Sequence, residues 1–114
     1  MTPKDILTTA ETIVNGDRQA DYGHPRDNHG CTAAMMEAYM HRRFQSDIKA
    51  GLPSRLFTAR DVCVFNILQK VSRLANTPTH ADSLVDIVGY ALNMAMIQDA
   101  EKPTDNTTTK GAGE

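Results

Sequence analysis

Charged side chains recur at helical spacing in two neighbouring stretches of the sequence. Lys70 and Arg73 are three residues apart, and Asp82 and Asp86 are four apart, so each pair shares one face of a helix. Lysine and arginine bind phosphate oxygens, arginine in bidentate fashion. Two aspartates at this spacing suit Mg²⁺, which takes carboxylate oxygens and keeps several waters for a phosphate substrate. The two pairs together indicate a site for a nucleotide or a related phosphorylated small molecule.

The two charged pairs meet if the chain reverses at Asn76 to Pro78, a sequence typical of a tight turn. Folding back there also brings an asparagine level with a tyrosine. The facing positions are Arg73 with Asp82, Lys70 with Asp86, and Asn66 with Tyr90. A second interpretation stays open, in which the charged pairs are interhelical salt bridges and Asp82 only caps a helix. Exposed pairs of that sort contribute about 0–1 kcal/mol to stability.

Residues 15–30, NGDRQADYGHPRDNHG, form a polar and turn-prone stretch between two helix patterns. Links between helices in a bundle take about 2–8 residues, so this predicted loop carries more chemistry than a connector needs. Arg18 can reach a phosphate from it, and Tyr22 can stack on a base. Three further side chains can hydrogen-bond a base or a sugar: Asp21, Asn28 and Asn66. Tyr90, level with Asn66 in the hairpin, completes the predicted substrate-binding set. The alternative is that Arg18 and Tyr22 tether the loop to the body of the protein.

Apolar residues at helical spacing predict four helices, and no segment shows the alternating pattern of a strand. Thr2 precedes a proline that suits the first turn of a helix, and Thr58 and Thr79 are each followed three residues later by an aspartate, which is an approximate capping signal for a helix start. The predicted helices span residues 3–15, 25–48, 58–76 and 79–100. The last two form an antiparallel hairpin packed on the first two, so the predicted fold class is all-α and similar to a four-helix bundle. Residues 1–101 make one domain, and residues 102–114 are expected to be a disordered tail.

The composition is that of an ordinary globular protein: of 114 residues, 40% are hydrophobic and 23% are charged, and the formal net charge is −2. No basic run is present, so direct nucleic-acid binding is not expected. No apolar stretch approaches the roughly 20 residues that span a bilayer, and the first residues lack the apolar block of a signal peptide. We therefore expect a cytoplasmic protein with no membrane partner. Cys31 and Cys63 lie in apolar helical patterns and are expected to be reduced core residues.

Four elements of the sequence carry a resemblance to known proteins: GDRQADYG (16–23), Asn28, DVCVFNILQKVSR (61–73) and HADSLVDIVGYALNM (80–94). Their joint pattern resembles a family of small, phage-encoded helical proteins of uncharacterised function. The pattern reads GDR-x-x-DYG, then K-x-x-R, then D-x-x-x-D-x-x-G-Y. The chain is also distantly similar to the MazG-like all-α nucleoside triphosphate pyrophosphohydrolases and to helical domains associated with phage nucleotide modification.

The resemblance to the pyrophosphohydrolases implies Mg²⁺-dependent cleavage of a nucleoside triphosphate to a monophosphate and pyrophosphate. It also implies a homodimer or higher homo-oligomer, acting in the host cytoplasm. Those enzymes carry an E-x-x-E pair on one helix and an E-x-x-D pair on a later one. Here the later pair reads Ser83-x-x-Asp86, and Glu37 stands without a partner at the E-x-x-E spacing.

Carried over onto this chain, the resemblance implies one set of catalytic residues and one set of metal ligands. The catalytic set is Lys70, Arg73, Asp82 and Asp86. The ligands of one Mg²⁺ are Asp82 and Asp86, with Glu37 or Asp61 as the further ligand. Lys70 and Arg73 would stabilise the charge that develops on the phosphate oxygens. Because the carboxylates depart from the family pattern, two other functions stay open. One is that the protein binds or sequesters a nucleotide without catalysis. The other is that it is a structural helical module that interacts with other proteins.

Overall fold

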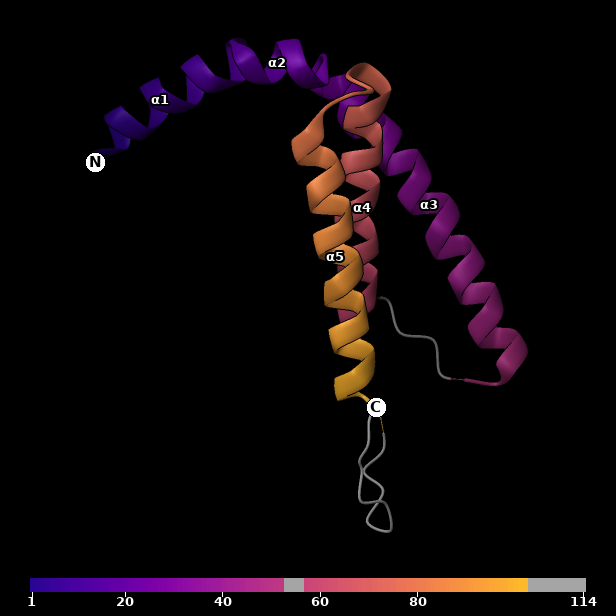
Figure 1. The fold of residues 1–114 in the computed structure, drawn as a ribbon. Helices are drawn as coiled ribbons and strands as arrows, with labels where there is room; N and C mark the ends of the chain where they lie inside the picture. The colour runs from indigo at the N-terminus through magenta and orange to yellow at the C-terminus, as the bar shows by residue number, and fades with distance from the viewer. Residues whose placement is uncertain (53–56, 103–114) are drawn as a thin grey trace.

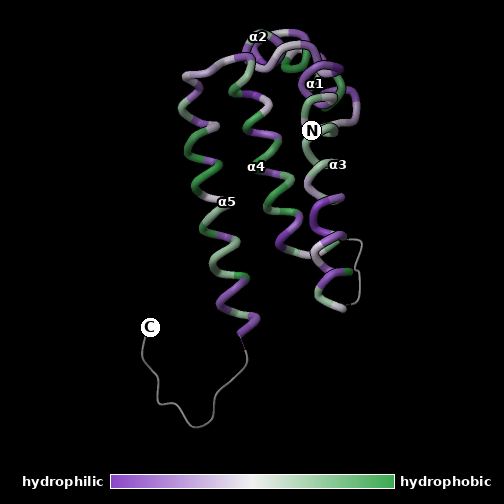
Figure 2. The backbone as a smooth tube through the Cα atoms, turned by 90° about the vertical axis from the view of Figure 1, so that its right-hand side faces the viewer, coloured by the Kyte–Doolittle hydropathy of each residue, from purple (hydrophilic) through white to green (hydrophobic). Residues whose placement is uncertain are grey.

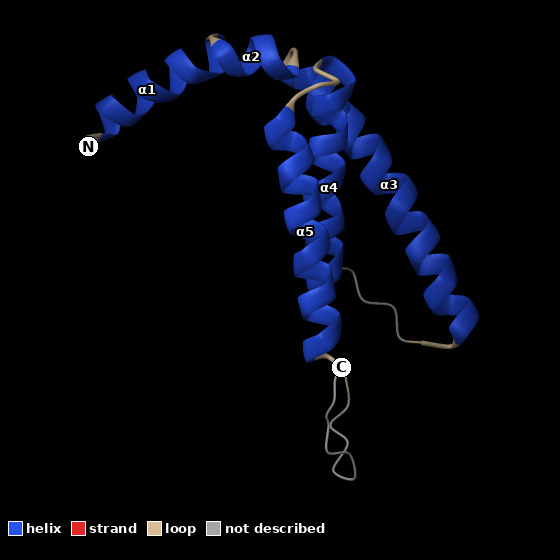
Figure 3. Cartoon of the chain, in the orientation of Figure 1, coloured by secondary structure: helices blue, strands red, loops and turns tan. Residues whose placement is uncertain are grey.

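The computed structural model describes residues 1–52 and 57–102, and these residues form five helices and no strand (Figures 1 and 3). In chain order the helices are α1 (Pro3–Asn15), α2 (Asp17–Tyr22), α3 (Pro25–Ala50), α4 (Ala59–Asn76) and α5 (Ala81–Ala100). The predicted all-α fold class is therefore confirmed. Of the predicted disordered tail, residues 103–114 lie outside the described residues. The extent of the single predicted domain, residues 1–101, stays a prediction.

The predicted caps are confirmed at the starts of α1 and α4. The Thr2 and Thr58 hydroxyls each accept a hydrogen bond from the backbone N–H three residues on, and the aspartate there accepts one from the N–H of the threonine. The start of α5 differs from the prediction. The cap is not Thr79 but His80, whose ring nitrogen accepts a hydrogen bond from the N–H of Ser83 at 3.3 Å. Helix α5 therefore begins at Ala81.

The polar stretch 15–30 is not the loop that the sequence predicted, because it contains helix α2. This helix follows α1 after one residue: the carbonyl oxygen of Gly16 accepts a hydrogen bond from the N–H of Gln19 at 3.2 Å. It ends at Gly23, whose φ of 80° and ψ of −174° are a conformation essentially limited to glycine. A helix of six residues is too short to show an apolar period, which needs a window of about 11–18 residues.

Helix α4 is the central element of the fold. It packs against α5, α3 and α2, whereas α3 and α5 make no contact with each other in the described part of the chain. Figure 2 shows α5, α4 and α3 side by side in that order. Helix α1 contacts only α2 and extends away from the other helices (Figure 1). The five helices therefore form an open arrangement in one chain.

Few apolar side chains are covered in this arrangement. Cys63 is the one buried hydrophobic residue among those described, and the other buried residues are Asn28, Thr32, Asp61, Ser72 and Ser83. Both cysteines are free, as predicted, but Cys31 is exposed, so its predicted place in the core is wrong. The radius of gyration is 19.0 Å, where a compact domain of about 100 residues has about 13 Å.

None of the helices formed by residues 1–52 and 57–102 combines the length and the apolar character that crossing a bilayer requires.

Candidate functional site

Helix α2 is held against the end of α4 through its backbone. The Asn76 side chain donates a hydrogen bond from Nδ2 to the carbonyl oxygen of Asp21 at 2.7 Å, and the Thr77 hydroxyl donates to the same oxygen. Gly23 lies so close that a Cβ atom there would be 3.1 Å from Oδ1 of Asn76. Asp21 therefore contributes its main chain to the fold. Its predicted role in binding a base or a sugar stays a prediction, with the residue exposed.

The docking of α2 places the ring of Tyr22 between two side chains from later parts of the chain. The guanidinium carbon of Arg73 lies 4.2 Å from the ring centroid, which is a cation–π contact. The imidazole ring of His80 meets Tyr22 edge-on, with the centroids 5.5 Å apart and an interplanar angle of 82°. Tyr22 therefore tethers α2 to the α4–α5 turn, one of the two roles considered for it. Base stacking by Tyr22 stays a prediction.

Arg73 does not pair with Asp82, contrary to the register predicted for the hairpin. Helix α2 brings the Tyr22 ring over the guanidinium group instead, and Asp82 is exposed. The Nε atom of Arg73 is buried and makes no hydrogen bond. Since a buried polar group nearly always has a partner, this nitrogen is an unsatisfied donor inside the protein, and a ligand reaches Arg73 only through the part of its side chain that lines the neighbouring cavity.

A cavity of about 230 Å³ lies beside Arg73, lined by residues from the end of α1 through α4. We call it the arginine pocket, because Arg18 and Arg73 both line it and no aspartate or glutamate does. The lining side chains best suited to a phosphorylated ligand are Arg18, Tyr22, Asn28, His29, Gln69 and Arg73. Sequence reasoning found all of them except His29 and Gln69. The signal for Gln69 was available, since it precedes Arg73 by four residues on one face of α4.

Asn28 is buried and holds α3 against α4. The Ser72 hydroxyl lies 2.7 Å from the carbonyl oxygen of Asn28 and 2.9 Å from its Oδ1 atom. The Thr32 hydroxyl donates a hydrogen bond to the same carbonyl oxygen at 3.2 Å. The side-chain oxygen of Asn28 therefore already has a hydrogen-bonding partner inside the protein. Its predicted contact with a base or a sugar is limited to the side-chain NH₂ group.

Lys70 pairs with Asp86, as the register of the hairpin predicted. Nζ of Lys70 lies 3.1 Å from Oδ2 of Asp86, and the two side chains are 11% and 46% exposed, respectively. Neither residue lines the arginine pocket. The other predicted pair is not brought together by a hydrogen bond: Asn66 lines a separate cavity between α3 and α4, and Tyr90 is half-buried on α5.

The three carboxylates predicted to hold Mg²⁺ do not converge in one chain. Asp82 and Asp86 lie on α5, Glu37 lies on α3, and these two helices do not touch because α4 lies between them (Figure 2). Among the described residues, no three or more His, Cys, Asp or Glu side chains are placed to hold a metal ion. The predicted ligand set therefore does not fit Mg²⁺ within a single chain.

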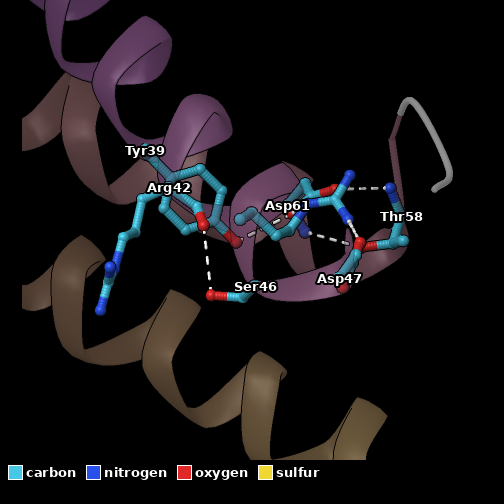
Figure 4. Close-up of polar contacts among 7 residues, drawn as sticks. Tyr39, Arg42, Ser46, Asp47, Thr58 and Asp61 are labelled. Carbon is cyan, nitrogen blue, oxygen red and sulfur yellow. Dashed lines mark hydrogen bonds and ion pairs between the residues drawn. The ribbon is translucent and has the colours of Figure 1, made fainter. Parts of the chain in front are cut away.

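A second polar cluster, centred on Asp61, joins α3 to the start of α4 (Figure 4). Asp61 is fully buried, and its Oδ1 accepts a hydrogen bond from the Tyr39 hydroxyl at 2.8 Å and lies 3.0 Å from Nε of Arg43. Its Oδ2 accepts a hydrogen bond from the N–H of Thr58 at 2.8 Å. Arg43 also pairs with Asp47 at 2.7 Å. The sequence predicted the capping role of Asp61 and its alternative role as an Mg²⁺ ligand, but not its contacts with Tyr39 and Arg43; no group of three or more metal-binding side chains forms around it among the described residues.

The contacts in this cluster balance the buried charge, so its chemistry is that of a structural anchor. Burial raises the pKa of Tyr39 to about 12, and the hydrogen bond to Asp61 adds to the shift. Because the Asp61 carboxylate is fully enclosed, a diffusing ligand has no access to it. The arginine pocket is therefore the better candidate for a functional site.

Fold and site together define an all-α protein with a cationic pocket between its short second helix and its central helix. The chain belongs to the DUF6378 family, described as a domain of unknown function, which matches residues 5–98. It is 39% identical over 106 residues to the Gene 55 protein of Mycobacterium phage L5. It is 30% identical over 123 residues to the Gene 55 protein of Mycobacterium phage D29.

These alignments cover 93% and 96% of this chain. The chain spans 58% of the length of the L5 protein and 73% of the D29 protein. The predicted resemblance to phage proteins is thus confirmed. No solved structure matches the chain. The further similarity to MazG-like pyrophosphohydrolases is tested by neither relative and stays a prediction.

Proposed function

We propose that this protein binds a nucleotide, or a closely related phosphorylated small molecule, in the arginine pocket. The observation that carries the proposal is that two arginines, Arg18 and Arg73, line one pocket that no aspartate or glutamate lines. A phosphate group would supply an opposite charge and hydrogen-bond acceptors to the guanidinium groups at the pocket wall. Arg18 lines the same pocket and forms no ion pair with another described residue, so a second cation is available to the same phosphate group.

The other lining residues favour a nucleotide over free phosphate. Tyr22 and His29 add aromatic rings to the wall, and Gln69 adds an amide that can recognise a base or a sugar. The volume of about 230 Å³ is below the roughly 300–1,000 Å³ of typical small-molecule sites. One chain therefore encloses the phosphate end of such a ligand, and the rest of the ligand extends beyond the pocket.

Binding without catalysis ranks first, because Asp82, Asp86 and Glu37 do not fit one Mg²⁺ ion in a single chain. Nucleoside triphosphate pyrophosphohydrolysis is the second candidate. The feature that favours it is the spacing of Asp82 and Asp86 one turn apart on α5, with Asp86 46% exposed beside Lys70. Either activity would be exercised in the cytoplasm of an infected host.

Isothermal titration calorimetry tests the binding proposal with the four dNTPs and with inorganic pyrophosphate, each in EDTA and in Mg²⁺. We expect binding in both buffers. Arg18→Gln and Arg73→Gln should each weaken it at least tenfold, because a hydrogen bond to a charged group contributes about 1.5–3 kcal/mol. Arg60→Gln is the matched control, since Arg60 lies at the start of α4, is 45% exposed and does not line the pocket. No heat with any ligand, or an equal loss in Arg60→Gln, would refute the proposal.

Chromatography of the same mixtures tests the second candidate. Release of monophosphate and pyrophosphate that requires Mg²⁺ and is abolished by Asp82→Asn and by Asp86→Asn would establish hydrolysis. Binding with no product would leave the non-catalytic function.

A further inference from the structure

Helix α5 is apolar around most of its circumference. It carries no charged side chain between Asp86 and Asp99, and one side of it packs on α4. The opposite side, which we call the outer face of α5, presents large apolar side chains that are 50% to 68% exposed: Leu84, Val85, Val88, Leu92 and Met96. A helix that is hydrophobic all round is normally buried on all sides. The outer face of α5 therefore requires a packing partner that the described part of its own chain does not supply.

Helix α1 has the same need. Its apolar stripe is formed by Ile6, Leu7, Ile13 and Val14, which are 43% to 61% exposed. The helix contacts only α2 and extends away from the rest of the molecule (Figure 1). An isolated helix of 13 residues is marginal in water, so α1 requires packing against a surface outside its own chain.

The surface that packs against α5 and α1 is needed to complete the hydrophobic core, and without it the chain has little apolar burial to stabilise its fold. Cys63 is the one buried apolar residue among residues 1–52 and 57–102, and a hydrophobic core is the main favourable term in folding. A partner needed for folding must be present whenever the chain folds, and a second copy of the chain meets that condition. We propose that the outer face of α5 and the apolar stripe of α1 pack against a second copy of this chain, forming an obligate homodimer.

Gly89 indicates where the two copies cross. It is exposed on the outer face of α5, four residues after Val85 and three before Leu92. Apart from its chain neighbours and the surrounding helix backbone, no described atom lies within 4 Å of a Cβ placed there. Glycine weakens the interior of a helix, but its missing side chain allows a second helix to approach closely. In a two-fold dimer the same patch faces itself, so the two Gly89 residues would face each other near the axis.

This inference depends on burial and not on the proposed ligand. Sedimentation velocity on the full chain tests it first, with an expected mass of twice 12.5 kDa. Val88→Glu and Leu92→Glu should lose both the dimer and the helical circular dichroism signal. Ile48→Glu, at a residue 72% exposed on α3 and outside the proposed contact, should keep both. A fully helical monomer at micromolar concentration would overturn the proposal, and so would a chain that folds only with a different protein.

Cross-linking keeps the proposal testable if the glutamate variants do not fold. In a Cys31→Ser background, Gly89→Cys should form a disulfide-linked dimer on mild oxidation. Gly30→Cys is the matched control, because Gly30 is also exposed, helical and free of atoms within 4 Å of its Cβ position. It should stay uncross-linked. A larger oligomer that links through Gly89→Cys supports the α5 contact, whereas equal linking at both positions, or none at Gly89→Cys, overturns it.

Discussion

The guanidinium carbon of Arg73 lies 4.2 Å from the centroid of the Tyr22 ring. This contact joins α4 to α2 and, at the same time, holds an arginine at the wall of the arginine pocket. Tyr22 is fixed in turn by the edge of the His80 ring. The same tyrosine therefore anchors the short helix and positions the cation on which the proposed binding function depends.

Two substitutions of Tyr22 should distinguish the contribution of its ring to nucleotide affinity from that of its hydroxyl group. Tyr22→Phe keeps a ring under Arg73 and should bind nucleotide with nearly unchanged affinity. Tyr22→Leu removes the cation–π contact, which contributes about 0.5–2 kcal/mol, so affinity should fall by about 2- to 30-fold. Calorimetry on both variants, with circular dichroism as the control for folding, measures the difference. An equal loss in both variants would show that the hydroxyl group, and not the ring, is what matters.

The sequence predicted contacts that a short turn determines and missed those that depend on docking. Lys70 and Asp86 were paired correctly because the turn after Asn76 fixes the register of α4 against α5. The contact of Arg73 with Tyr22 could not be predicted in the same way, since it depends on where α2 docks. That docking is fixed by hydrogen bonds between side chains of the turn and the backbone of α2, which leave no periodic signal.

Two other residues show the same limit. Asp61 was correctly predicted to cap α4, but its burial and its contacts with Tyr39 and Arg43 depend on the packing of α3. Glu37 was grouped with the carboxylates of α5 by a resemblance in sequence. The central position of α4 keeps Glu37 away from them, and spacing along the chain contains no information about that order of helices.

Two glycine-to-alanine changes should affect stability in opposite directions. Gly23→Ala forces alanine to a φ of 80° and a ψ of −174°, and its Cβ would lie 3.1 Å from Oδ1 of Asn76. We expect a loss of about 1–3 kcal/mol. Gly30→Ala places a methyl group in open space within α3 and should stabilise the protein by about 0.5–1 kcal/mol. Urea unfolding at one fixed protein concentration measures both, and a destabilised Gly30→Ala would contradict the open surface found there.

The raised pKa of Tyr39 predicts a loss of stability in alkali. Burial and the hydrogen bond to Asp61 raise this pKa from 10.0 to about 12, so the folded state holds the proton more tightly than the unfolded state. The resulting stabilisation is fully present below pH 10 and is lost as the pH rises toward 12. Unfolding measured across that range should show a smaller loss in Tyr39→Phe than in the unmodified chain. Identical pH profiles would mean that Tyr39 does not contribute.

Val14 links the proposed dimer to the proposed ligand, because it belongs to the exposed stripe of α1 and also lines the arginine pocket. Val14→Ala should therefore lower both the thermal stability of the dimer and its nucleotide affinity. The change removes the equivalent of two methylene groups, each contributing about 0.8 kcal/mol when buried, so affinity should fall by about fourfold if one of them contacts the ligand and about 15-fold if both do. Ile6→Ala removes apolar surface from the same stripe but outside the pocket, so it should weaken the dimer and leave affinity unchanged. Thermal unfolding and calorimetry at equal protein concentrations measure the two effects. If Ile6→Ala also lowers nucleotide affinity, the partner copy acts on the pocket through the whole of α1. If Val14→Ala lowers neither the thermal stability nor the affinity, Val14 contributes to neither the dimer contact nor the ligand contact.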